Sequence, residues 1–234
     1  MRPTIHELWV PGGLGNHPSR PMASISYITI HTTGNHNPTA TAEAHARFQF
    51  SGGGGRQASW HYTVDADEIW QSFKNEQMCW HTGTRIGNEN SIGIEICVNR
   101  REGFRAACER AAGLTVYLMK EYGLGLGEVV QHHHWSRKNC PAELRAGNWG
   151  LGWVDFLNMV QGRCGDAPAD AVVRALQDAG VRFDEAHWRG VFEGRIRANK
   201  EWTRILAGRV IDERWGYLDE GVIREALMVL LGRG

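Results

Sequence analysis

Short apolar runs separated by polar turns dominate the first 160 residues of the chain. Residues 25–30, Ile-Ser-Tyr-Ile-Thr-Ile, form a run typical of a buried strand, and His31 follows at its end. Residues 91–98 alternate, which predicts a second strand with two different faces. One face carries Ile92, Ile94 and Ile96, and the other carries Gly93, Glu95 and Cys97.

Three further runs predict strands. Residues 60–64 and 68–73 are joined through Asp-Ala-Asp, which indicates a hairpin. Residues 129–130, Val-Val, are a short strand that leads directly into a cluster of histidines.

Helical spacing and capping residues predict three helices in the same region. Asn37 is a plausible N-cap with Pro38 at the first helical position, so we expect a helix that runs to about residue 50. The glycine run at 51–55 predicts a flexible loop, and residues 153–160 predict a terminal helix. The longest helix is indicated by Phe104, Ala107, Ala111, Leu114, Leu118 and Tyr122.

The composition changes after residue 162. Residues 163–169, Arg-Cys-Gly-Asp-Ala-Pro-Ala, predict a linker, and residues 170–234 carry three apolar stripes at helical spacing. We therefore expect a first domain at 1–162, with an irregular arm at 1–24, and a small all-α second domain. The stripes indicate a core and identify no ligand.

Composition and charge narrow the classes of function. Hydrophobic residues make up 42% and charged residues 22%, as in soluble globular proteins. A formal net charge of zero gives no reason to expect nucleic acid or stable membrane association. Five cysteines without regular spacing argue against a disulfide framework. No apolar stretch near the N-terminus has the character of a signal peptide, so we expect synthesis in the cytoplasm.

Histidine and cysteine spacing suits a metal site. A catalytic zinc site needs three protein ligands and an open fourth position, and imidazole and thiolate match the softness of Zn²⁺. His31 ends a predicted strand, and seven residues separate His132 from Cys140 in Gln-His-His-His-Trp-Ser-Arg-Lys-Asn-Cys. Spacing alone leaves the alternative open, because surface histidines are often solvated and a free cysteine is often a core residue.

Glu95 interrupts an otherwise apolar strand. A carboxylate there costs desolvation energy unless it has a partner or a function. Burial would raise its pKa toward neutrality, as a general base requires. A salt bridge at the edge of the sheet is the alternative.

Five strings occur in an order that resembles the type-2 N-acetylmuramoyl-L-alanine amidases, a family of phage and prophage endolysins, bacterial autolysins and peptidoglycan recognition proteins. They span residues 28–35, 59–65, 80–83, 90–96 and 132–141. The resemblance implies an α/β fold with a mixed central β-sheet flanked by helices, and zinc in a surface groove. It covers residues 25–160.

The resemblance also implies roles for individual side chains. They are the zinc ligands His31, His132 and Cys140, the catalytic residues Glu95, Lys138 and Tyr62, and the groove residue His81. Two positions depart from the family: Arg137 stands where relatives often carry glycine, and His134 where they often carry aspartate. The neighbouring His133 and His134 are alternatives to His132 as a ligand, but the seven-residue gap to Cys140 favours His132.

The implied function is hydrolysis of the amide between muramic acid and L-alanine in bacterial peptidoglycan, by a lysin that reaches the wall after the membrane is permeabilised. A monomer is slightly favoured, and the sequence leaves the oligomeric state open. The second domain would then target the wall. A non-catalytic peptidoglycan-binding module is one alternative, although such relatives typically lack the residue at Cys140. A cytoplasmic muropeptide-recycling amidase is another. An unrelated zinc hydrolase is a third, although His-Glu-x-x-His is absent.

Overall fold

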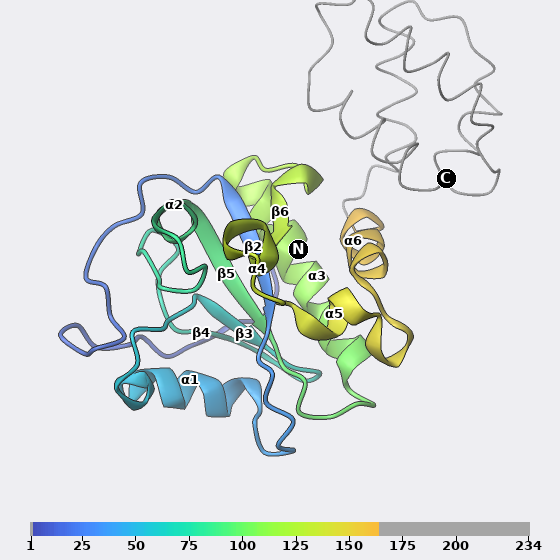
Figure 1. Cartoon of the computed structure of the whole chain (residues 1–234), viewed down its shortest axis with the longest axis horizontal. Coiled ribbons are helices and arrows are strands. Elements are labelled where there is room, and N and C mark those ends of the chain that lie inside the picture. Colours follow the sequence, from blue (N-terminus) through green and yellow to red (C-terminus); the bar gives the residue numbers. More distant parts are fainter. Residues whose placement is uncertain (1, 164–234) are drawn as a thin grey trace, which may run out of the picture. The chain divides into compact units, whose positions relative to one another are not determined.

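A six-stranded mixed sheet forms the centre of the fold, with strand order β1-β4-β3-β5-β2-β6 (Figure 1). The computed structural model describes residues 2–163, so the predicted helical domain at 170–234 and nearly all of the predicted linker lie outside the described residues. The strands are β1 (His6–Glu7), β2 (Tyr27–Thr32), β3 (Tyr62–Val64), β4 (Ile69–Gln71), β5 (Ser91–Ile96) and β6 (Val129–Gln131).

Helices flank this sheet, as the resemblance implied. The α-helices are α1 (Ala42–Phe50), α2 (Arg85–Asn90), α3 (Phe104–Tyr122), α4 (His132–Ser136), α5 (Ala142–Ala146) and α6 (Trp153–Gln161). Three single 3₁₀ turns are η1 (Gly53–Gly55), η2 (Leu126–Glu128) and η3 (Asn148–Gly150). Helix α3 packs against β5, β3 and α6, whereas α1 packs against β3 and β4. No helix within residues 2–163 is both long and apolar enough to cross a membrane.

Alternation along β2 and β5 builds the core, and the predicted faces of β5 are confirmed. The isoleucines of these strands have no exposed surface: Ile28, Ile30, Ile92, Ile94 and Ile96. Helix α3 covers them and ends at Gly123, whose φ of 65° is the left-handed conformation that favours glycine at a helix C-terminus.

Parallel pairing brings the polar faces of the central strands together. All pairs of neighbouring strands are parallel except the β3–β4 hairpin, which was predicted. His31 of β2 lies opposite Glu95 of β5, and Thr63 of β3 lies opposite Glu95 on its other side. Because parallel strands end at the same edge, β2 and β6 also deliver His31 and His132 to one place.

Helix α1 begins four residues later than predicted. The Thr41 hydroxyl accepts a hydrogen bond from the Ala44 amide, and the Asp65 carboxylate accepts one from the Ala42 amide. These two acceptors satisfy the free donors of the first turn. Asn37 instead accepts from the Thr39 amide in a local turn before the helix.

The glycine run and the N-terminal arm are more structured than predicted. Residues 53–55 form a 3₁₀ turn, in which a side chain on Gly53 would come within 3.2 Å of the Asn16 amide. In the arm, β1 pairs with β4, and a β-bridge joins Pro21 to Gln77. Val10 of the arm is buried against Phe73 and Cys79. The arm is therefore part of the domain.

Candidate metal centre and groove

Three buried side chains meet at the ends of β2 and β6. The Nδ1 atoms of His31 and His132 are 3.1 Å apart, and the Cys140 Sγ lies 3.6 Å from His31 Nδ1. Each of the three atoms lies within 4.8 Å of the others. His132 belongs to this group, and neither His133 nor His134 does.

The spacing of these atoms fits a tetrahedral zinc ion. Zinc–nitrogen bonds near 2.0 Å and a zinc–sulfur bond near 2.3 Å place two nitrogens about 3.3 Å apart and nitrogen and sulfur about 3.5 Å apart. Two imidazoles and one thiolate leave the fourth position open, as in catalytic zinc sites. The donor set therefore suits Zn²⁺ in both chemistry and geometry.

A chain of hydrogen bonds fixes the tautomer of His31. The Nε2 of His81 lies 3.0 Å from the Ser91 carbonyl oxygen, which can only accept, so this nitrogen carries the proton. The bare Nδ1 of His81 then accepts from His31 Nε2 at 2.9 Å. His31 Nδ1 is left with a free lone pair directed at His132 and Cys140, as a metal ligand requires.

Gly93 makes room for this arrangement. A Cβ at Gly93 would lie 2.8 Å from His81 Nδ1, closer than side-chain atoms approach one another. Any larger residue at this position of β5 would displace the His81 ring, so the glycine of the predicted polar face has a steric role.

Hydrogen bonds also hold the segment that joins His132 to Cys140. The His133 amide donates to the Cys140 carbonyl at 3.0 Å, and the Ala142 amide donates to the Thr32 hydroxyl at 3.1 Å. Arg137 ends α4 with a φ of 61°. This left-handed conformation favours glycine, so the arginine is strained where the family often has glycine.

Glu95 lies beside the three side chains of this candidate metal group. Its Oε1 is 4.0 Å from His31 Nδ1, and its buried Oε2 has no hydrogen-bond partner among the described residues. Burial raises the pKa of Glu95 to about 8, although the positive charge of Lys138 acts in the opposite direction. The sheet-edge alternative is wrong, because β5 lies between β3 and β2.

Burial also controls the protonation of His31, His132 and Cys140. It lowers the pKa of His31 well below its usual value and that of His132 to about 4, so both imidazoles are neutral and offer lone pairs. It raises the pKa of the Cys140 thiol to about 12, with a further contribution from the charge of Glu95. A bound cation would have to displace the thiol proton.

A groove of about 850 Å³ opens over the site. Lys138 lines it together with His31, Glu95 and His81. Phe48 of α1, with 41% of its surface exposed, and Trp60 form an aromatic wall of the same groove. The sequence predicted neither wall residue, because most tryptophans serve packing and Phe48 carries no motif.

The position of Tyr62 differs from the one that the resemblance implied. It pairs with Ile94, and Thr63 pairs with Glu95, so the Tyr62 side chain points to the α3 face. Its hydroxyl donates to Asn75, which in turn donates to the hydroxyl of Tyr122 in α3. The role at the site that the resemblance implied for Tyr62 is therefore wrong for this geometry.

Fold and site together define an α/β protein with a His-His-Cys group, suited to a metal ion, in a surface groove. A family model described as N-acetylmuramoyl-L-alanine amidase matches residues 21–143, just over half of the chain. The chain belongs to this family.

Two curated relatives come from Bacillus subtilis (strain 168). The amidase XlyA is 41% identical over 138 residues, which are 58% of this chain and 46% of XlyA. The amidase CwlH is 39% identical over 158 residues, which are 66% of this chain and 60% of CwlH. The chain thus spans about half the length of the curated relatives it matches.

Solved structures agree with the fold. The catalytic domain of XlyA is 37% identical with a TM-score of 0.60, over 67% of this chain and 99% of that domain. PlyL is 28% identical with a TM-score of 0.59, over 67% of this chain and 96% of PlyL.

Proposed function

We propose that this chain is a zinc-dependent N-acetylmuramoyl-L-alanine amidase that cuts the amide between the muramic acid lactyl group and L-alanine in bacterial peptidoglycan. The observation that carries the proposal is the group formed by His31, His132 and Cys140, with Glu95 beside it. The amidases XlyA and CwlH, which share this family, support the choice of substrate.

Each site residue has a separate task in the proposed reaction. When bound, Zn²⁺ would act as a Lewis acid that polarises the carbonyl and makes water more acidic. In its ionised form, which the charge of a bound Zn²⁺ would favour, Glu95 takes the proton of the attacking water. The Lys138 ammonium stabilises the negative charge that develops on the carbonyl oxygen. Glu95 then returns the proton to the leaving amine of L-alanine.

The biological role that we propose is that of an endolysin, which acts on the wall once the membrane has been permeabilised. One structural neighbour at 37% identity is a mutant endolysin from Bacillus subtilis. The proposed second domain at 170–234 would bind the wall.

Digestion of purified peptidoglycan tests the activity. We expect new N-terminal alanine, no new reducing sugars, loss of activity with a zinc chelator, and recovery when Zn²⁺ is returned. Cys140→Ala should bind no zinc and lose at least about 10³-fold in rate, because a ligand and its charge are removed. New reducing ends would identify a glycosidase and contradict the proposal.

Tight binding of several wall types without any product would instead support the non-catalytic binding module. Activity on soluble muropeptides but not on intact wall would support the recycling amidase. Both outcomes would overturn the endolysin role, and only the first would overturn the chemistry.

A further inference from the structure

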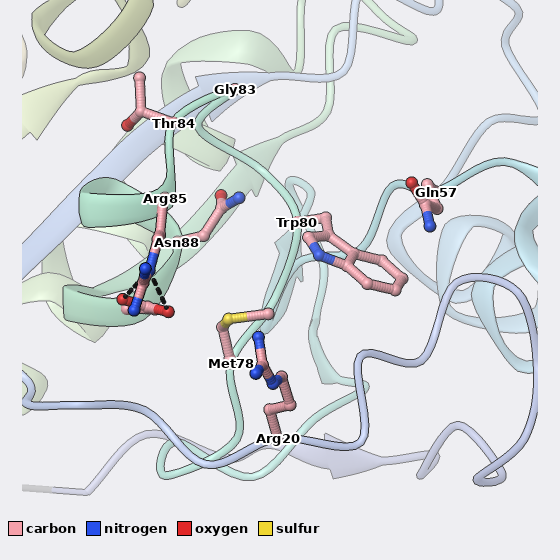
Figure 2. Close-up of a pocket in the computed structure, with 9 residues that line it drawn as sticks. Arg20, Gln57, Met78, Trp80, Gly83, Thr84, Arg85 and Asn88 are labelled. Carbon is pink, nitrogen blue, oxygen red and sulfur yellow. Dashed lines mark hydrogen bonds and ion pairs between the residues drawn. The ribbon is translucent and has the colours of Figure 1, made fainter.

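A second pocket, of about 380 Å³, adjoins the groove on the side of α2 (Figure 2). Trp80 and Gly83 line both cavities, so the smaller one, which we call the side pocket, borders the groove that holds the metal group. Its polar lining consists of Arg20, Gln57, Thr84, Arg85, Asn88 and Glu89. A substrate that fills the groove can therefore extend into the side pocket.

Asn88 presents a hydrogen-bond donor to the side pocket. Its Oδ1 accepts from the amide of His81 at 3.0 Å, and from the amide and the hydroxyl of Thr82, both at 2.9 Å. Three donors on one oxygen fix which way the amide group lies. The Nδ2 group makes no hydrogen bond among the described residues, and in Figure 2 it points toward the space beside Trp80.

Arg20 contributes an unmatched positive charge. Its carbonyl accepts a hydrogen bond from the Met78 amide at 2.9 Å, and the bridge between Pro21 and Gln77 holds the next residue. The backbone is thereby fixed, while the side chain is exposed and has no acidic partner within residues 2–163.

The acidic side chain at the side pocket does not offset this charge. The Nε of Arg85 lies 2.9 Å and 3.0 Å from the two carboxylate oxygens of Glu89, so these two residues neutralise one another. The side pocket is left with donors from Arg20 and Asn88 and one net positive charge, a set that matches an anion.

We propose that the side pocket binds a free carboxylate on the peptide part of the substrate, with Arg20 as the charged partner and Asn88 Nδ2 as a second donor. The proposal rests on the proposed function, because it assigns the peptide side of the same substrate to this end of the groove. Arg20 is thus a specificity-determining residue remote from the reacting bond.

Peptide binding tests the assignment without requiring catalysis. The probes are a peptidoglycan stem tetrapeptide with free carboxyl groups and the same peptide with every carboxyl group converted to carboxamide, titrated into the full chain by calorimetry. We expect the free acid to bind roughly three- to tenfold more tightly, and the difference to shrink at high salt because screening weakens exposed charge pairs.

Three variants sharpen the result. Arg20→Gln should abolish the preference, and Arg20→Lys should keep part of it. Arg47→Gln is the matched control, because Arg47 is an exposed arginine that pairs with Glu43 on α1 and does not line the side pocket. In peptidoglycan digestion, Arg20→Gln should raise KM and leave kcat nearly unchanged.

Equal binding of the two peptides to the wild-type chain would overturn the proposal, and so would a preference that survives in Arg20→Gln. Failure of the amidase proposal is a separate result. It would appear as absence of new N-terminal alanine on digestion, while the two peptides would still report on the side pocket.

Discussion

Along β2 and β5, the face toward α3 carries five isoleucines without exposed surface, whereas the other face includes Thr29, His31, Gly93 and Glu95. On the isoleucine face, each side chain removed from water stabilises the folded state by about 1.5–3 kcal/mol. On the polar face, Thr29 is satisfied, because it donates to Ser91 and accepts from Trp135. Close to the metal group, Glu95 Oε2 is buried without a partner among the described residues.

The difference shows how one pair of strands serves two purposes. Burial on the α3 face stabilises the fold, and the same rigid strands hold polar groups on the opposite face at a cost in desolvation. Substitutions on the polar face should therefore change activity, and substitutions on the α3 face should change stability.

Glu95→Gln should give the largest effect. The amide keeps the size of the side chain but cannot take a proton, so the rate should fall by about 10²–10⁴-fold while zinc content is unchanged. Release of N-terminal alanine and metal analysis measure the two quantities. Full activity in this variant would show that another group is the base.

Ile94→Ala tests the opposite face. Removing a fully buried side chain from the core should lower the free energy of unfolding by about 2–5 kcal/mol, measured by urea titration. The matched control is Ile86→Ala, because 68% of Ile86 is exposed and its loss should change stability by less than about 0.5 kcal/mol. If the Ile94→Ala variant were folded but inactive, the assignment of stability to one face and activity to the other would be contradicted.

A decrease in pH should lower the stability of the folded chain through His61. Burial lowers the pKa of His61 from 6.5 to about 4. Between these values the unfolded chain binds a proton that the folded chain does not, so the free energy of unfolding falls as pH decreases, by up to about 3 kcal/mol for this residue. Urea titrations at several pH values in zinc-free buffer should show a smaller slope in His61→Gln. An unchanged slope would contradict the assignment.

His81→Ala should have the smallest effect of the four. It removes the acceptor that orients His31, which should weaken zinc binding by about 10–100-fold, measured by competition with a chromophoric chelator. The matched control is His45→Ala, because His45 lines the groove but belongs to no ligand group. Equal zinc affinity in His81→Ala and the wild type would show that the hydrogen bond has no such role.

Much of the sheet could be predicted from the sequence, because the alternation in β5 and the apolar run of β2 follow directly from burial of one face. The start of α1 could not, since it depends on Asp65, a distant residue that accepts from the Ala42 amide. Helices α2, α4 and α5 are too short to show periodicity. Residues beyond 163 lie outside the described part, so the second domain stays a prediction.

The part of the site that could be predicted consists of side chains with distinctive chemistry that stand in recognisable motifs. His31, His132 and Cys140 meet as expected, and Glu95 and Lys138 line the same groove. Tyr62, whose role came from the resemblance, lies on the face opposite to Glu95, because successive positions along a strand face opposite sides and Thr63 is the residue that pairs with Glu95. The Ser91 carbonyl could not be found in the sequence, since every residue has such a group and only the fold selects one.

The contact between that carbonyl and His81 has a consequence for metal capture. The proton positions on two imidazoles are set by the main chain, so His31 has its ligating form before any ion arrives. The side chains that would hold the ion are then already ordered when the chain folds, so they lose little further conformational entropy when the ion binds. If the proposed zinc site is correct, the metal should leave and return without refolding, and its capture should be limited by diffusion and by release of the Cys140 proton.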